Sequence, residues 1–247
     1  MIVWIILGTI LLVLAIILIF GSPRKRSERE YELEGIYDPE VADAFEKMNN
    51  LFPFKIIRSR VVSRIKQCNP QGTLIDVGCG TGRLLVQIAK KIENIELIGV
   101  EVAGEMIEIT RSQIEELSLD NRIDLKKGSA ENLPLADESV DFIVSTLSLH
   151  HWTNPTKAYC EFFRILKFGG TLLIFDFRRD SRKLCHWFLK FITKVIAPKP
   201  LKKIGEPLGS LQASYNFSEL NKISKSFPFK DITFNNALCW IFIESKK

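Results

Sequence analysis

The sequence lacks an organised set of cysteines. Its five cysteines are an odd number, lie scattered along the chain and include no C-x-x-C pair. Such a set argues against a disulfide framework and a structural zinc site, and it is typical of a reducing compartment. No metal ion is therefore expected. The sequence also has no internal repeat and no low-complexity segment, so its 247 residues predict one globular domain.

The chain also lacks a strong charge of either sign. Its formal net charge is only +5, and charged residues make up 26% of the sequence. This composition is ordinary for a globular core, and it does not predict nucleic acid as a partner.

Charged side chains are missing altogether from residues 2–20, which are apolar apart from Gly8 and Thr9. As a helix this run would be about 28 Å long, enough to cross a hydrocarbon core. Because no charged segment precedes it, a transmembrane anchor at 1–21 is favoured over a cleaved signal peptide or a buried helix. The cluster Arg24-Lys25-Arg26 follows in a polar linker at 22–35, which predicts a cytoplasmic catalytic domain.

The most informative segment is the run Thr73–Gly82, with the sequence TLIDVGCGTG. An apolar stretch broken by Asp76 leads into glycines at 78, 80 and 82, and a helical pattern begins at Leu84. This order predicts a buried strand, a tight turn and a helix N-terminus. Glycines in such a turn let a ligand approach the backbone N–H groups near the positive end of the helix.

Arg83 decides which ligand suits this turn. The dinucleotide fingerprint G-x-G-x-x-G would place its third glycine at this position. A long side chain there would crowd a pyrophosphate, which disfavours a nicotinamide-dependent oxidoreductase. We therefore expect an adenosine ligand with an amino-acid end, whose cationic group Asp76 could meet.

Five further segments, in the same order as in the family, resemble the class I S-adenosylmethionine-dependent methyltransferases. They are Ile98–Glu101, Lys127–Leu135, Val140–Ser145, Leu149–Trp152 and Arg164–Gly170. The resemblance covers a methyltransferase domain at about 36–247 and is nearest to the ubiquinone/menaquinone-biosynthesis-like branch. It implies a Rossmann-like fold, S-adenosylmethionine as co-substrate, and methyl transfer as the reaction.

The resemblance also assigns cofactor-binding residues. It implies that Glu101 holds the ribose hydroxyls, that Val102 lies against the adenine, and that Ser129 replaces an aspartate that meets the adenine amino group. Cys79 is interpreted as a small filler between glycines. The full predicted set is Asp76, Gly78, Cys79, Gly80, Gly82, Glu101, Val102, Met106, Ser129, Ala130 and Ser145.

Alternating strand and helix patterns predict an α/β fold with a doubly wound, mainly parallel sheet. Strands are expected near 73–78, 95–101, 122–127, 140–146 and 170–176, and helices near 81–93, 104–117 and 154–167. A closing hairpin at 229–234 and 238–243 brings the sheet to seven strands, and the resemblance makes the last strand antiparallel. One helix is predicted to start at Asp38-Pro39 and another near 56–66, and the resemblance implies that both lie over the cofactor.

The candidate catalytic residues are His150 and His151, just after the fourth strand. The resemblance implies that their loop faces the methyl group, and a base is useful when the acceptor must lose a proton. Both could instead be ordinary loop residues. Tyr37 and Tyr215 are further candidates for the mouth of the site.

An insert after the fifth strand carries an amphipathic pattern. Leu184, Trp187, Phe188, Phe191, Ile192, Val195 and Ile196 fall on one helical face. Seven Lys or Arg and no acid occur between Arg182 and Lys203. A basic, aromatic helix of this kind is typical of binding to an anionic membrane surface. Its apolar face could equally pack on the sheet or cap the pocket.

Together these features predict a methyltransferase that moves a methyl group from S-adenosylmethionine to a small, lipophilic, quinone- or lipid-like acceptor at the membrane. Two alternatives stay open: a non-catalytic, membrane-tethered module that binds S-adenosylmethionine, and a methyltransferase for a soluble small molecule. A nucleic-acid methyltransferase is not expected, because no base-flipping segment follows the strand at 140–146.

Overall fold

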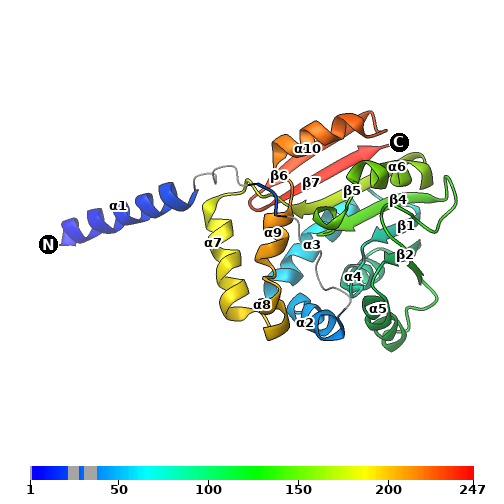
Figure 1. The fold of residues 1–247 in the computed structure, drawn as a ribbon, viewed down its shortest axis with the longest axis horizontal. Coiled ribbons are helices and arrows are strands. Elements are labelled where there is room, and N and C mark those ends of the chain that lie inside the picture. The colour runs from blue at the N-terminus through cyan, green and yellow to red at the C-terminus, as the bar shows by residue number, and fades with distance from the viewer. Residues whose placement is uncertain (1, 22–27, 31–37) are drawn as a thin grey trace.

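The computed structural model describes residues 2–21, 28–30 and 38–247. Its centre is a seven-stranded sheet with the order β3-β2-β1-β4-β5-β7-β6, seen in Figure 1 with helices around it. The strands are β1 Gly72–Val77, β2 Ile95–Glu101, β3 Ile123–Lys127, β4 Val140–Thr146, β5 Leu166–Phe177, β6 Asp231–Ala237 and β7 Trp240–Lys246. Strands β1 to β5 are parallel, and β7 runs antiparallel between β5 and β6. The predicted fold class is confirmed.

The first seven helices follow the predicted order, and α8, α9 and α10 were not predicted. The helices are α1 Ile2–Gly21, α2 Pro39–Asn49, α3 Phe52–Gln67, α4 Arg83–Lys91, α5 Gly104–Glu116, α6 Pro155–Ile165, α7 Lys183–Phe191, α8 Lys199–Lys203, α9 Leu208–Ala213 and α10 Phe217–Ile223. The expected starts of α2 and α6 are confirmed, because the Asp38 side chain accepts from Glu40 N and the Asn154 side chain accepts from Lys157 N. Each side chain satisfies a backbone donor that the first helical turn leaves open.

The sheet is buried on both faces. On one face Ile75, Ile143 and Ile174 pack with α6 and α10, and on the other Leu74, Phe142 and Leu173 pack with α3 and α4. Adjacent residues of one strand thus enter different cores, as the two-residue period of a strand requires. The strand order reverses between β1 and β4, so the carboxyl ends of these strands form the crevice where such sheets bind ligands.

The strand boundaries differ from the prediction by more than one residue in two places, at β5 and at the closing hairpin. Strand β5 begins at Leu166, directly after α6, where it pairs with Val140. The closing hairpin lies two or three residues later than expected. The reason is that Phe227 and Phe229 pack against the buried ring of Tyr159 in the core instead of joining the ladder.

Helix α1 forms where the apolar run predicts it and extends away from the domain (Figure 1). No helix in the ranges that the structure describes is long and apolar enough to cross a membrane. The expected transmembrane span at 1–21 is therefore not found there.

Of the predicted linker at 22–35, the structure describes only residues 28–30. This part contacts the domain through Arg29, while Glu28 and Glu30 are exposed. The Arg29 guanidinium donates to Ala213 O at 2.6 Å, to His150 O at 2.8 Å and to the Tyr215 hydroxyl at 3.0 Å, and it lies 4.1 Å from the centre of the Tyr215 ring. The Arg29 side chain is thus held by three hydrogen-bond acceptors and by the face of an aromatic ring. The charge pattern of the segment alone could not predict these contacts.

The cysteines also require a correction. Cys185 of α7 is bonded to Cys239, in the turn between β6 and β7, across 54 residues of sequence. Cys68, Cys79 and Cys160 are free. The scattered spacing argued against a disulfide framework, and a single disulfide is not a framework, but the sequence did not predict this pair. Spacing could not reveal this pair, because the fold brings two distant segments together.

Candidate functional site

The predicted glycine turn is confirmed, and its three glycines have different roles. All three have positive φ, which favours glycine. A Cβ at Gly78 would lie 2.4 Å from Ser148 Oγ, and one at Gly82 would lie 2.3 Å from Thr110 Cγ2. Gly80 has no atom within 4 Å of that position. Gly78 and Gly82 thus permit close packing, while Gly80 exposes its backbone to the cavity.

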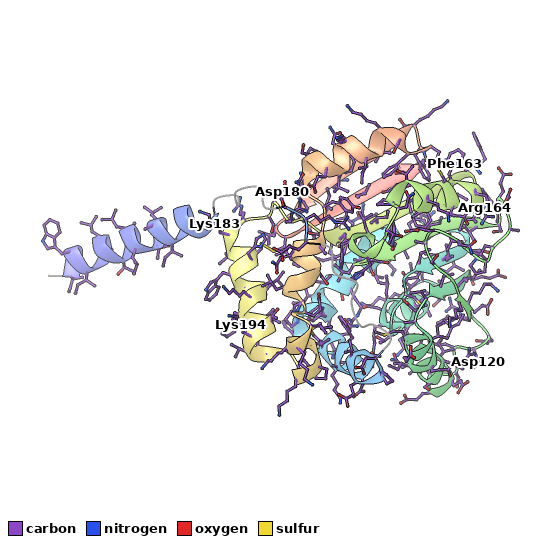
Figure 2. All side chains as sticks on the ribbon, viewed as in Figure 1. Asp120, Phe163, Arg164, Asp180, Lys183 and Lys194 are labelled. Carbon is purple, nitrogen blue, oxygen red and sulfur yellow. A yellow bond between two sulfur atoms is a disulfide. The ribbon has the colours of Figure 1, made fainter. Side chains whose placement is uncertain are left out.

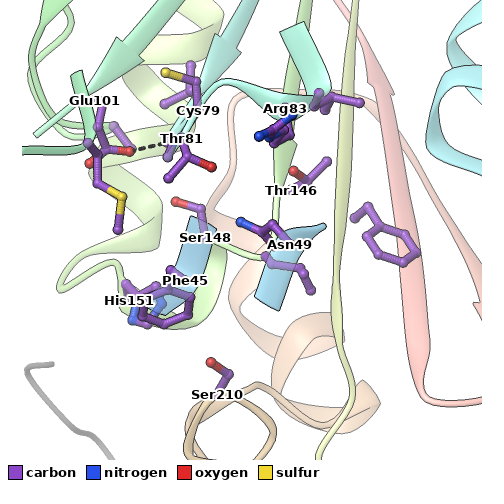
Figure 3. A pocket seen from close by; sticks show the side chains of 18 of the residues that line it. Phe45, Asn49, Cys79, Thr81, Arg83, Glu101, Thr146, Ser148, His151 and Ser210 are labelled. Carbon is purple, nitrogen blue, oxygen red and sulfur yellow. Dashed lines mark hydrogen bonds between the residues drawn. The ribbon is translucent and has the colours of Figure 1, made fainter. Parts of the chain in front are cut away.

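Glu101, at the end of β2, organises this turn. One carboxylate oxygen accepts from Gly80 N at 2.9 Å, and the other accepts from Val102 N at 2.8 Å and Ala103 N at 3.0 Å. Figure 3 shows the first of these bonds at the edge of the cavity. The side chain is only 7% exposed. A buried carboxylate held in this way retains lone pairs for a pair of hydroxyl donors.

Asp76 lies beneath the turn and is 1% exposed. Neither of its carboxylate oxygens has a hydrogen-bond partner among the described residues. Burial, reinforced by the nearby Glu101, raises its pKa to about 8. Since an orphaned buried carboxylate costs stability, its position is best explained by a cationic ligand group that would lower its pKa again.

Arg83 occupies the position of the absent third glycine and lines the cavity. Its guanidinium forms an ion pair with Glu46 of α2, and its Nε lies 2.8 Å from Glu46 Oε1. Because the side chain reaches toward α2, it ties this helix to the start of α4. The close packing that a dinucleotide fold assigns to its third glycine is provided here by Gly82 against Thr110.

A cavity of about 510 Å³ opens at the carboxyl ends of the strands. Its size is in the range of small-molecule sites, about 300–1,000 Å³. On one side it is lined by the glycine turn, the end of β2 and residues 128–131. On the other side it is lined by α2, α3, the end of β5 and residues 206–210. Figure 3 shows Glu101 and Cys79 at one side of this space and Ser210 at the other.

Most predicted cofactor residues line this cavity. They are Gly78, Cys79, Gly80, Glu101, Val102, Met106, Ser129 and Ala130. Burial raises the pKa of the Cys79 thiol well above its usual range, in keeping with a filler between glycines and not with a nucleophile.

Three predicted cofactor residues are not part of the cavity wall. Asp76 is the buried carboxyl beneath the turn. Gly82 packs against Thr110 and is not part of the cavity wall. Ser145 is fully buried and donates to Val77 O at 2.7 Å, while the next residue, Thr146, lines the cavity. Because side chains alternate along a strand, these two consecutive positions of β4 face opposite sides.

The two candidate catalytic histidines occupy different positions. His151 lines the cavity, whereas His150 is 1% exposed and lies behind it. His150 Nδ1 is 2.7 Å from Asp176 Oδ1, and the two imidazole rings are 4.0 Å apart. Burial, His150 and the Arg29 guanidinium lower the pKa of His151 to about 2, so its ring is neutral at physiological pH.

Several cavity residues were missed by the sequence analysis. The acceptor side of the wall includes Phe45 and Arg58 from the first two domain helices, and Glu206, Pro207 and Ser210 from the insert. Glu206 is buried and accepts from Ser210 N and Oγ. The only sequence signal for these residues was the expectation that the N-terminal helices cover the cofactor. Of the candidate mouth residues, Tyr37 lies outside the described residues, and Tyr215 packs with Arg29 instead of lining the cavity.

Within the described ranges no group of three or more His, Cys, Asp or Glu side chains could hold a metal ion.

Comparison with known proteins shows which proteins this chain resembles. Residues 75–174 match the model of a family described as a methyltransferase domain. The ubiquinone/menaquinone biosynthesis C-methyltransferase of Geotalea daltonii is 28% identical over 180 residues, which cover 70% of this chain and 76% of that protein. The protein of the same name in Rickettsia bellii is 25% identical over 233 residues, covering 88% and 92%. The crystal structure of a candidate S-adenosylmethionine-dependent methyltransferase from Methanococcus maripaludis matches with a TM-score of 0.65 and 22% identity, over 90% of this chain and 97% of that one.

The chain is a class I S-adenosylmethionine-dependent methyltransferase for small molecules. Within that class it is a distant relative of the ubiquinone/menaquinone biosynthesis enzymes. The residues present fit the cofactor. Asp76 has two orphaned oxygens for the amino group, Glu101 offers a carboxylate for the ribose, and Gly80 presents bare backbone.

Proposed function

We propose that this methyltransferase acts on a small lipophilic acceptor, of the quinone or lipid-precursor type, at a membrane. One observation carries the proposal. Beyond the glycine turn, the cavity wall consists mainly of aromatic and aliphatic side chains: Phe45, Met48, Phe54, Ile57, Val61, Leu147, Trp152, Phe175 and Phe177. Such walls bind a ligand chiefly by removing its apolar surface from water. The names of the two curated relatives, which refer to quinone biosynthesis, support the same acceptor class.

The N-terminal helix supports the membrane part of this proposal. Ile2, Trp4 and Leu11 of α1 are 71%, 78% and 65% exposed, and the other described apolar side chains of this helix are exposed as well. Exposed apolar surface of this extent marks an interaction site. The basic cluster Arg24-Lys25-Arg26 that follows supports a catalytic domain on the cytoplasmic side.

The residues of the cavity can position two substrates without forming a covalent bond to either. Bound S-adenosylmethionine supplies an activated methyl group, so the protein needs mainly to bind, align and exclude water. Asp76, Glu101 and the backbone of Gly80 hold the cofactor end. Phe175 and Phe177 line the end of the cavity assigned to the methyl acceptor. His151 is neutral and can accept a hydrogen bond from an acceptor hydroxyl, which fixes the direction in which the acceptor faces.

Replacing His151 with alanine tests this positioning role. We expect turnover to fall about 10- to 100-fold, because the acceptor loses a hydrogen-bond partner at the reacting end. Affinity for S-adenosylmethionine, measured by calorimetry, should change less than about twofold, since the residues assigned to the cofactor are untouched. Since the His151 pKa is about 2, the wild-type rate should show no loss of activity from its protonation above about pH 5. Unchanged turnover in the variant would remove His151 from the site.

The acceptor class can be tested directly with the full chain. Purified protein is incubated with methyl-labelled S-adenosylmethionine and, separately, with membrane extract and with soluble extract. We expect label in the organic phase of the membrane reaction, in a lipid or quinone that has gained one CH₂ group by mass spectrometry. The Glu101→Ala variant is the control for label that does not depend on the cofactor site.

Label found only in a water-soluble product would replace the proposed acceptor by a soluble one and leave the methyltransferase activity intact. Calorimetric binding of S-adenosylmethionine without transfer to either extract would instead support the non-catalytic binding module.

A further inference from the structure

The helix α7 and the turn after it, Ile192–Ile196, present two different faces. Leu184, Trp187, Phe188, Phe191, Val195 and Ile196, here called the α7 face, are between 43% and 58% exposed. The opposite side is buried, with Cys185, Leu189 and Ile192 packed in one cluster with Phe177 and Leu211. The disulfide to Cys239 fastens that same side to the sheet. The α7 face therefore does not pack on the sheet.

The α7 face also does not cap the cavity. The cavity wall takes its contribution from a later part of the insert, residues 206–210. Trp187 and Phe191 instead stack on each other at the surface, with ring centres 6.0 Å apart. Packing on the sheet is thus the role of the opposite side of α7, and lining the cavity is the role of residues 206–210. Neither role explains the α7 face.

The charges around the α7 face have one sign. All seven basic residues of the segment are exposed, namely Arg182, Lys183, Lys190, Lys194, Lys199, Lys202 and Lys203, and the segment contains no acid. Figure 2 shows Lys183 at the start of α7, next to α1, and Lys194 in the turn that follows α7. The helices α1 and α7 are in contact, so the exposed apolar surfaces of both lie on the same side of the domain.

We propose that the α7 face is a docking surface for an anionic lipid bilayer. Its aromatic and aliphatic side chains enter the boundary between headgroups and acyl chains, while the surrounding lysines meet the phosphates. Lysine stems extend along apolar surface and keep their charge at the headgroup level, which suits this arrangement. A second copy of the chain is a poorer occupant, because the seven basic side chains of one copy would face and repel those of the other. A protein partner is also a poorer occupant, because lysine is depleted in protein interfaces.

Docking here is independent of the identity of the acceptor and adds a second membrane contact to α1. It would hold the domain against the bilayer at the side from which residues 206–210 reach the cavity. The proposal requires only that the α7 face meets lipid, so it can fail while the methyltransferase activity stands.

Fluorescence quenching of Trp187 in the full chain tests the proposal. The background variant Trp4→Phe removes the tryptophan of α1, and Trp152 and Trp240 lie within the domain at 6% exposure and half-buried, respectively. Vesicles of brominated phosphatidylglycerol and phosphatidylcholine should quench the emission and shift it to the blue. Vesicles of brominated phosphatidylcholine alone should quench it much less. The further variant Trp187→Phe should remove the quenchable signal.

The basic residues are tested by a matched pair of triple variants. Changing Lys183, Lys190 and Lys194 to Gln should weaken partition to the anionic vesicles at low salt at least about tenfold, since each base contributes about fivefold. Changing Lys222, Lys225 and Lys230 to Gln removes the same charge from an exposed region elsewhere and should have at most a small effect. Cofactor affinity should be unchanged in both, which shows that the domain is folded.

Three results would overturn the proposal: quenching that persists after Trp187→Phe, equal quenching by anionic and neutral vesicles, or equal weakening by the two triple variants. A blue shift that grows with protein concentration in the absence of lipid would instead indicate pairing of two copies through this face, and would also overturn it.

Discussion

Replacing Glu101 with alanine should lower the affinity for S-adenosylmethionine at least about a hundredfold. The carboxylate accepts three backbone hydrogen bonds, from Gly80, Val102 and Ala103, and it is the group expected to hold the ribose. Each bond to a charged group contributes about 1.5–3 kcal/mol, so the loss of two ribose contacts alone accounts for this effect. Calorimetric titration of the full chain with the cofactor measures it.

A control in the same strand separates binding from folding. Glu96 is an exposed acid of β2 outside the cavity, and Glu96→Ala should leave the affinity unchanged within about twofold. Gly80→Arg should act like Glu101→Ala, because a side chain at φ +54° would be strained and would fill the space next to the turn. Unaltered cofactor affinity in both Glu101→Ala and Gly80→Arg would contradict the site assigned to the cofactor.

Replacing Asp76 with asparagine should weaken cofactor binding and, at the same time, stabilise the protein without its cofactor. The buried carboxyl has its pKa raised to about 8 from an ordinary value of 3.8. Between these values the folded protein keeps the proton and the unfolded chain has lost it. The stability of the wild type therefore falls as the pH rises from about 4 to about 8.

The amide side chain of the Asp76→Asn variant has no such titration, so the difference between the two proteins should be small near pH 4 and grow toward pH 8. We expect a gain of about 1–3 kcal/mol in the free energy of unfolding at the upper end, measured by urea denaturation. Asp124→Asn, at an exposed strand residue paired with Lys126, is the control and should show no such pH-dependent gain. If the gap between wild type and Asp76→Asn does not depend on pH, the assigned role of Asp76 is wrong.

The fold was predictable from local patterns because the spacing of apolar residues distinguishes helices from strands. Apolar runs such as Leu74-Ile75 and Phe142-Ile143-Val144 are buried on both faces, as parallel strands require, and the capping residues Asp38 and Asn154 mark helix starts. The predicted strand boundaries are wrong where packing in the core competes with the local sequence pattern. Phe227 and Phe229 have the composition of a strand, yet the buried ring of Tyr159 draws them into the core.

The cofactor side of the cavity was predictable to the level of residues because it is built from one continuous turn and the ends of two neighbouring strands. Two residues of the predicted set do not line the cavity because of the direction in which their positions face. Ser145 and Thr146 occupy consecutive positions of β4 with opposite faces, and the pattern could not show which one meets the cavity. Gly82 fits the motif, but its absent side chain makes room for Thr110 and not for a ligand.

By itself the sequence determined the class of fold and the co-substrate, because the glycine turn and the ends of β1 and β2 depend on local geometry. It also predicted Asp76 and Glu101 as the acids that hold this co-substrate. Only the tertiary structure decided what lies opposite the cofactor. It separated His151 at the cavity from His150 behind it, brought residues 206–210 to the wall, and joined Cys185 to Cys239. It also showed that the α7 face is exposed. The physical reason is distance along the chain: these contacts join segments tens of residues apart, and no local period carries information about them.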